Sequence, residues 1–240
     1  MKAPFQGNFY IVATPIGNQK DITIRALEIL SRVDLILCED SKKTIPFLRS
    51  LKIPTPAKTL HRSDDPRYLE FLWKGLQEGK QFAFVSDAGT PGISDPGSRI
   101  VRLLREKSVN IVPVPGPSAL ATLLSVSGFQ ANPTLFLGFL SEKKGKKRAQ
   151  LQKARETEGL IVWYESVHKF PGVLEIIQEV FPEREILIGR ELTKIHEEIL
   201  YYPSIQDLME SPPVWKGEFT ILVNNHPNFT KGTPASTDTF

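Results

Sequence analysis

The chain has 240 residues, enough for one large domain or for two domains of about 110 residues each. Hydrophobic residues make up 40% of it and charged residues 24%, a balance typical of soluble globular proteins. The net charge of +3 is too small to indicate a nucleic-acid partner by itself, and the single cysteine, Cys38, excludes an intramolecular disulfide.

Neither a secretion signal nor a membrane helix is expected. Residues 1–8 contain no apolar stretch of the kind found in signal peptides. The segment 108–141 is uncharged, but prolines and glycines interrupt it before an apolar run reaches the roughly 18–20 residues that cross a bilayer. We therefore expect a cytoplasmic protein that does not bind a membrane.

The first half of the chain alternates predicted strands with predicted helices. Strands are expected at 8–13, 33–38, around 59, 81–85 and 110–114, and helices at 22–30 (capped by Asp21), about 41–51, 67–78 and 97–107. Strands that are apolar almost throughout indicate a parallel sheet with helices on both faces. We expect an N-terminal α/β domain over residues 1–116 with a mostly parallel sheet.

The pattern changes in the second half. An uncharged helix at 118–126 is expected to be buried on all sides. Strands are expected at 135–140, 160–164, 186–189, 197–202 and 218–223. Because only two or three helices separate these strands, we expect a second α/β domain with a mixed sheet over residues 117–225. The polar residues 226–240 are expected to form a disordered tail.

The loop Ser86–Gly97 carries the strongest functional signal. It reads Ser-Asp-Ala-Gly-Thr-Pro-Gly-Ile-Ser-Asp-Pro-Gly and follows an apolar strand. Glycine allows close backbone approach to a ligand, and proline stiffens the loop. Asp95 followed by Pro96 is typical of a helix N-cap with proline at the first helical position. Since ligands bind beyond the carboxyl ends of parallel strands, we interpret this loop as part of a binding site. The alternative is an ordinary β–α turn, although such turns usually need only about two to six residues.

Four loops follow strand ends and are expected to converge at one edge of the sheet. They are Thr14–Asn18, Glu39–Ser41, Ser86–Gly97 and Pro115–Ala119. The four histidines show no pairing at ligand spacing, so no metal site is expected. The phosphate-binding and dinucleotide-binding glycine motifs and the nucleophile elbow are all absent. A different ligand is therefore expected at this edge.

Further motifs follow in a fixed order. These motifs are Asp21–Thr23, Gly138–Leu140, Tyr164–His168, Arg190–Glu198 and Lys216–Phe219, and they add to the four loops above. In this order the motifs resemble the RsmI family, a branch of the tetrapyrrole-methylase-like enzymes, over about residues 8–224. The resemblance implies two α/β domains of tetrapyrrole-methylase type with S-adenosylmethionine in the cleft between them, usually in a homodimer. It also implies 2′-O-methylation of a cytidine ribose in the decoding region of small-subunit (16S) ribosomal RNA, free or in the 30S particle.

The resemblance also implies a set of cofactor-binding residues. They are Pro15, Ser86, Asp87, Ala88, Gly89, Thr90, Pro91, Ile93, Ser118, Ala119, Tyr164, Glu165, Leu192 and Gly217. Asp87 suits the positive sulfonium and α-amino groups of the cofactor. The chain departs from the family pattern in several places, among them Gln19, Lys42, Lys43, Val167 and Lys169.

Catalytic and RNA-binding candidates lie in the second half. The candidates for assisting the ribose hydroxyl are Glu165, Glu191 and Lys194, with Glu197 beside them, and the alternative for each is a structural ion pair. The RNA-binding candidates are basic: Lys143, Lys144, Lys146, Lys147, Arg148 and Arg190. The alternative for the basic cluster is a solvated helix.

Two other functions remain open from the sequence. A tetrapyrrole-type methyltransferase acting on a small molecule would share the fold and the cofactor. A non-catalytic RNA-binding module would share the basic cluster but would leave the Ser86–Gly97 loop unexplained.

Overall fold

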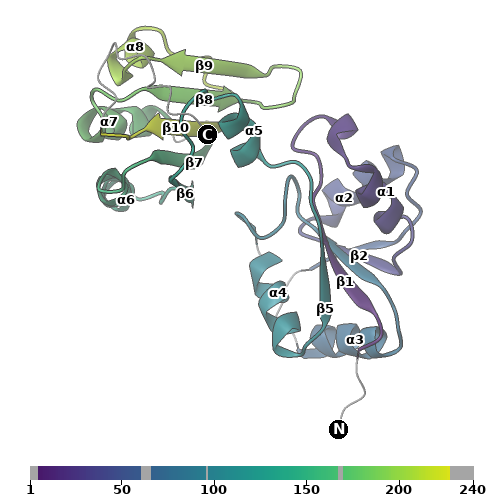
Figure 1. Cartoon of the computed structure of the whole chain (residues 1–240). Helices are drawn as coiled ribbons and strands as arrows, with labels where there is room; N and C mark the ends of the chain where they lie inside the picture. The colour runs from purple at the N-terminus through teal and green to yellow at the C-terminus, as the bar shows by residue number, and fades with distance from the viewer. Residues whose placement is uncertain (1–4, 61–65, 96, 167–169, 228–240) are drawn as a thin grey trace, which may run out of the picture. The chain divides into compact units, whose positions relative to one another are not determined.

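The computed structural model describes residues 5–60, 66–95, 97–166 and 170–227 (Figure 1). The chain divides into two compact units, Met1–Ala119 and Leu120–Phe240, and each contains its own five-stranded sheet. Most of the expected C-terminal tail, residues 228–240, lies outside the described residues. Within the described ranges, no helix is both long enough and apolar enough to cross a bilayer.

The first unit contains a fully parallel sheet. Its strands are β1 (Asn8–Val12), β2 (Leu35–Cys38), β3 (Ala57–Thr59), β4 (Phe82–Val85) and β5 (Asn110–Val114), in the order β3-β2-β4-β1-β5. Its helices are α1 (Ile24–Leu30), α2 (Ser41–Ser50), α3 (Pro66–Gln77) and α4 (Gly97–Glu106). Every strand pair of this sheet is parallel, which confirms the expected N-terminal α/β architecture.

Helices cover both faces of this sheet, with α1 and α2 on one face and α3 and α4 on the other (Figure 1). Strand β4 shows why its sequence is apolar throughout. Ala83 and Val85 belong to the cluster under α1 and α2, whereas Phe82 and Phe84 belong to the cluster under α3 and α4. Successive side chains point to opposite faces of a strand, so both must be apolar when both faces are covered. Only the edges of the sheet then remain for a ligand.

The start of α1 differs from the prediction. Asp21 does not cap it, because a short 3₁₀ helix (Gln19–Asp21) comes first and Ile22 is extended. The N-cap is Thr23, whose hydroxyl accepts a hydrogen bond from the backbone N–H of Ala26 at 3.1 Å. A hydroxyl two residues further on therefore stabilises the helix start.

The second unit contains a mixed sheet, as the sequence predicts. Its strands are β6 (Thr134–Phe139), β7 (Leu160–Ser166), β8 (Ile186–Arg190), β9 (Glu198–Tyr202) and β10 (Glu218–Asn224), in the order β6-β7-β10-β8-β9. Only β6 and β7 run parallel, and the other pairs are antiparallel. Three further helices are α6 (Lys144–Arg155), α7 (Phe170–Val180) and α8 (Ile205–Glu210).

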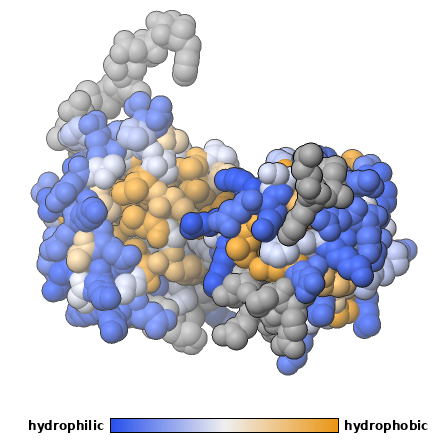
Figure 2. All heavy atoms as spheres, turned by 90° about the horizontal axis from the view of Figure 1, so that it is seen from below, coloured by the Kyte–Doolittle hydropathy of each residue, from blue (hydrophilic) through white to orange (hydrophobic). Residues whose placement is uncertain are grey.

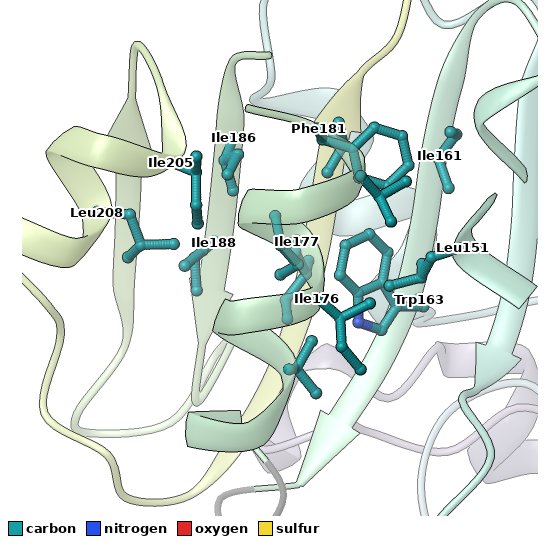
Figure 3. Packing of buried hydrophobic residues seen from close by; sticks show 14 of the residues in the cluster. Leu151, Ile161, Trp163, Ile176, Ile177, Phe181, Ile186, Ile188, Ile205 and Leu208 are labelled. Carbon is teal, nitrogen blue, oxygen red and sulfur yellow. The ribbon is translucent and has the colours of Figure 1, made fainter. Parts of the chain in front are cut away.

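The core of the second unit lies between this sheet and helices α6, α7 and α8. Figure 3 shows Ile176 and Ile177 of α7 directed at the sheet, where Trp163 and Ile188 lie. All four side chains have 0% exposure. On the surface, Figure 2 shows patches of hydrophobic residues surrounded by hydrophilic ones.

Helix α5 (Ala119–Ser125) is less buried than its sequence predicts. Among its residues only Leu123 is buried, and Val126 just beyond it is 50% exposed. Leu123 packs on Gly189 of β8, where an added Cβ would lie 2.9 Å from Leu123 Cδ1. One side chain therefore docks the helix on its sheet, and an uncharged sequence does not require burial on every side.

Candidate functional site

The loops after β1, β4 and β5 are joined by hydrogen bonds. Thr14 and Gly89 form a two-way backbone bridge, in which Thr14 N donates to Gly89 O at 2.9 Å and Gly89 N donates to Thr14 O at 3.1 Å. The Thr14 hydroxyl donates to Ser86 O at 3.4 Å, and the Thr90 hydroxyl donates to Pro117 O at 2.9 Å. The loops therefore converge at the carboxyl edge of the sheet, as the sequence predicts.

Two glycines permit this close packing. Gly89 has a positive φ of +78°, and an added Cβ would lie 3.3 Å from Ile16 Cγ2 and 3.7 Å from Pro117 O. At Gly116 an added Cβ would lie 2.9 Å from Ala13 Cβ. Glycine thus allows the three loops to approach one another closely.

Asp95 fixes the far end of the β4 loop. Its Oδ2 accepts a hydrogen bond from Gly92 N at 2.6 Å, and its Oδ1 accepts one from Gly97 N at 2.7 Å. Gly97 is the first residue of α4, so the Asp95 side chain accepts a hydrogen bond from a backbone N–H that the helix itself leaves free. The predicted contribution of Pro96 lies outside the described residues.

The loop after β2 joins the same site through Asp87. The backbone N–H of Asp87 donates to Glu39 Oε1 at 3.3 Å, and the Lys43 ammonium lies 2.6 Å from Asp87 Oδ2. Lys43 lies in the first turn of α2, a helix capped by Asp40. The sequence alone predicted no role for Lys43, and the only signal was its departure from the family pattern.

The carboxyl edge is acidic. Burial raises the pKa of the Glu39 carboxyl above its ordinary value; the Asp87 backbone hydrogen bond opposes the rise, and the charges of Asp87 and Asp95 add to it. The hydrogen bond to Asp87 raises the pKa of Lys43, which therefore stays protonated. Glu39 and Asp87 together provide negative charge suited to a cationic ligand.

A second cluster forms in the turn after β8. The Lys194 ammonium lies 2.8 Å from Glu191 Oε1 and 2.9 Å from Glu218 Oε2. Glu191 and Thr193 both have positive φ, at 49° and 66°, a conformation that costs free energy in residues other than glycine. At Gly217 an added Cβ would lie 2.4 Å from Glu191 Oε1, so glycine leaves room for that carboxylate.

The ion pairs of this turn fix its charge states. Burial alone would lower the pKa of Lys194, but its hydrogen bonds to Glu191 and Glu218 raise it above the ordinary value. Burial opposes the effect of Lys194 at Glu191, yet the hydrogen bonds from Lys194 and from the Glu218 backbone hold the pKa of Glu191 below its ordinary value. Lys194 is therefore a cation and Glu191 a carboxylate at neutral pH.

Arg190 joins this turn to neighbouring segments of the second unit. Its side chain is only 7% exposed, and it lies 2.8 Å from Glu198 Oε2. Its Nε donates to Lys216 O at 2.7 Å. Arg190 was predicted to contact RNA, but its donors join the β8–β9 turn to the segment before β10.

Lys147 and Glu165 form a buried ion pair. Their side chains are 6% and 2% exposed, and Lys147 Nζ lies 3.3 Å from Glu165 Oε2. Glu165 Oε1 also accepts a hydrogen bond from Ser166 N at 3.2 Å. A buried lysine with a buried carboxylate partner cannot reach a phosphate in solution, so Lys147 differs from the exposed lysines of its helix.

The other basic residues of α6 divide into two groups. Lys144 and Arg148 pair with Glu175 and Glu179 of α7, at 2.6 Å and 2.9 Å. Lys143 and Lys146 are exposed and have no ion-pair partner in the part of the chain that the structure describes. Among those same residues, no group of three or more His, Cys, Asp or Glu side chains could hold a metal ion.

Known proteins share both the sequence and the fold of this chain. Residues 8–207 match the family model described as Tetrapyrrole (Corrin/Porphyrin) Methylases. Ribosomal RNA small subunit methyltransferase I of Leptospira biflexa is 54% identical over 97% of this chain and 97% of its own, and that of Escherichia coli O157:H7 is 40% identical over 96% and 82%. The chain belongs to the ribosomal RNA small subunit methyltransferase I branch of the tetrapyrrole methylase family.

Solved structures share the tetrapyrrole methylase fold. The methyltransferase CobJ is 20% identical, with a TM-score of 0.66 over 92% of this chain and 95% of its own. Uroporphyrin-III C-methyltransferase from Thermus thermophilus, solved in complex with S-adenosyl homocysteine, is 16% identical, with a TM-score of 0.62 over 91% and 98%. At these identities the likeness shows the fold alone.

The cofactor-binding candidates of this methylase chain fall into two sets. Pro15, Ser86–Pro91, Ile93, Ser118 and Ala119 belong to the joined loops of the first unit, where the Ser86 hydroxyl donates to Ala88 O at 3.2 Å and shapes the loop. Tyr164, Glu165, Leu192 and Gly217 belong to the second unit. There the strand register pairs Phe219 with Glu165 on one side and with Arg190 on the other, so the ends of β7 and β8 meet the start of β10.

The raised pKa of Glu39 should make the folding stability of this methylase chain depend on pH. Because folding raises its pKa, the folded state binds more protons than the unfolded state between the ordinary value of 4.5 and the raised one. The contribution of Glu39 to the free energy of unfolding should therefore decrease as pH rises through that window. Urea unfolding from pH 4 to 7 should show that Glu39→Gln gains stability relative to wild type as pH rises. If the free energies of unfolding of wild type and Glu39→Gln changed with pH in parallel, this account of Glu39 would be contradicted.

Proposed function

We propose that the chain is an S-adenosylmethionine-dependent methyltransferase that modifies small-subunit ribosomal RNA at the 2′ oxygen of a cytidine in the decoding region. The observation that carries the proposal is the 54% identity to a ribosomal RNA small subunit methyltransferase I over 97% of both chains. The joined loops of the first unit give the proposal a physical site. We further propose that the protein acts as a homodimer on small-subunit RNA or on the 30S particle.

The residues of the carboxyl edge fit the methyl donor. S-adenosylmethionine supplies a methyl group on a positively charged sulfur and carries an amino-acid end. The carboxylates of Glu39 and Asp87 match this positive charge. The complex of a protein of this fold with S-adenosyl homocysteine supports the same choice.

We propose different roles for the three candidate catalytic residues. Lys194 is a cation held by two carboxylates, so it orients Glu191 and does not accept a proton. Glu191 uses Oε1 for Lys194 and for Glu218 N, which leaves Oε2 to accept a hydrogen bond from the ribose hydroxyl and orient it. Glu165, paired with Lys147 in the interior, positions the end of β7. Most of the rate acceleration would come from holding the hydroxyl in line for displacement.

We propose that Lys143 and Lys146 contact RNA phosphates. Both are exposed at the start of α6, whereas Lys144 and Arg148 are engaged by α7. Lys147 does not join this surface because it is buried. Phosphate contacts of this kind orient the RNA without reading its sequence.

The direct test is methylation mapping. Small-subunit RNA and 30S particles that lack the modification are incubated with the protein and S-adenosylmethionine, and ribose methylation is mapped by resistance to alkaline cleavage. The proposal predicts one newly protected cytidine in the decoding region. Methyl transfer to a tetrapyrrole but not to RNA would establish the small-molecule alternative. RNA binding without cofactor binding would establish the non-catalytic alternative.

Asp87 tests the cofactor site. Removing a charge-assisted contact should weaken S-adenosylmethionine binding to Asp87→Ala by about tenfold or more, as measured by calorimetry. Glu106→Ala, which removes a carboxylate 58% exposed on α4, serves as the control and should bind as wild type does. If Asp87→Ala bound the cofactor as tightly as wild type, the proposed role of Asp87 would be wrong.

The basic surface predicts a change in salt dependence. Removing one phosphate-binding lysine should reduce the slope of log affinity against log salt by about 0.7–0.9, so the slope of the double variant Lys143→Gln/Lys146→Gln should fall by roughly 1.5. Lys74→Gln, an exposed position on α3, is the matched control. RNA binding measured from low to moderate salt gives both slopes. An unchanged slope in the double variant would remove α6 from the RNA-binding surface.

A further inference from the structure

The Lys43–Asp87 ion pair has no role in the function proposed so far beyond the charge of Asp87. We infer that the two side chains together bind the amino-acid end of S-adenosylmethionine, with Lys43 contacting its α-carboxylate and Asp87 its α-ammonium. The inference rests on the proposed function, since it specifies how the same site recognises its cofactor.

Both members of the pair keep unused hydrogen-bonding capacity. Lys43 Nζ donates to Asp87 Oδ2 at 2.6 Å, which uses one of its three N–H donors. Asp87 Oδ1 has no hydrogen-bond partner among the residues that the structure describes. The side chains are 67% and 25% exposed, so a ligand can reach both. Exposed ion pairs add little to folding stability. Stability therefore gives this pair only a small role, whereas ligand binding would give it a larger one.

The backbone holds both residues in place. Asp87 lies between Ser86, whose carbonyl accepts from the Thr14 hydroxyl, and the Thr14–Gly89 bridge. Its own N–H donates to Glu39. Lys43 lies in the first turn of α2, where its backbone N–H donates to Asp40 O at 3.2 Å. The pair therefore combines residues from two neighbouring strand ends with fixed backbones.

The charge around the pair explains why a lysine is needed. Glu39, Asp40 and Asp87 make this part of the carboxyl edge acidic, which favours the sulfonium and the ammonium of the ligand. The same charges repel its carboxylate. Lys43 supplies positive charge directly beside Asp87, so a zwitterion can place its ammonium on Asp87 and its carboxylate on Lys43. Glu39 and Asp40 leave the remaining edge suited to the sulfonium.

A competing arrangement predicts the opposite result. If Lys43 only neutralised Asp87 and competed with the ligand's ammonium, removing Lys43 would tighten binding. Whether Lys43→Met binds S-adenosylmethionine more weakly or more tightly than wild type therefore separates the two arrangements.

The test pairs variants with ligands that lack one group at a time. Calorimetry measures the affinity of wild type, Lys43→Met and Asp87→Asn for S-adenosylmethionine, for decarboxylated S-adenosylmethionine and for methylthioadenosine, which has no amino-acid end. Lys43→Met should weaken S-adenosylmethionine binding by about tenfold and should not weaken binding of the decarboxylated ligand, which has no carboxylate for Lys43 to contact. Asp87→Asn should weaken both of these ligands, and neither variant should change methylthioadenosine binding.

Two further variants serve as controls. Lys42→Met removes the neighbouring exposed lysine of the same helix turn and should bind every ligand as wild type does. Lys43→Arg keeps the charge and should retain most of the affinity for S-adenosylmethionine.

The outcomes separate this inference from the proposed function. If the wild-type protein bound S-adenosylmethionine and Lys43→Met bound it equally well or more tightly, the inference would be overturned and the proposed function would stand. An equal loss for the decarboxylated ligand would also overturn it, because Lys43 would then not act on the carboxylate. A wild-type protein that bound no S-adenosylmethionine would overturn the proposed function and the inference together.

Discussion

Two backbone hydrogen bonds between Thr14 and Gly89 are the constraint on which the carboxyl edge of the first unit depends. They join the loops that leave β1 and β4 at the point where these neighbouring strands end. The Thr14 hydroxyl adds a contact to Ser86, and Thr90 extends the link to the loop after β5. Gly89 makes the bridge possible because its φ of +78° is unfavourable for other residues.

The same constraint explains how a chain with little net charge can present a strongly charged site. Helices cover both faces of the parallel sheet, so polar groups gather where the strands end. The bridge sets the backbone on either side of Asp87, and this brings Asp87 to Glu39 and Lys43 from the neighbouring strand end. In the second unit the charged residues of the β8–β9 turn also pair with one another: Lys194 with Glu191 and Glu218, and Arg190 with Glu198.

Much of the fold follows from local sequence patterns. Strand β5 begins and ends where its sequence predicts, and the apolar strands correctly indicate a parallel sheet with two covered faces. The predicted start of α1 was wrong by two residues because Asp21 and Thr23 both suit an N-cap, and the extended backbone at Ile22 decides between them. The predicted burial of α5 was wrong because an uncharged helix does not show how many of its faces meet a partner.

The candidate site was less predictable, because its decisive contacts join residues far apart in the chain. Lys43 and Asp87 are 44 positions apart, and neither residue indicates the other. Lys147 belongs to a run of basic residues that looks uniform in sequence, yet its position on α6 turns it toward Glu165 and into the interior. The loops themselves were found because glycine, proline and aspartate mark strand ends, whereas the pairing of charges depends on the folded backbone.

Hydrogen–deuterium exchange with and without S-adenosylmethionine tests most directly whether the joined loops hold the cofactor. The account predicts that the cofactor slows amide exchange in residues 14–18, 39–43, 86–95 and 115–119. Amides at the opposite edge of the sheet, around Gly79 and Ser108, should exchange as before. Unchanged exchange in the four loops under saturating cofactor, with protection elsewhere, would contradict the account.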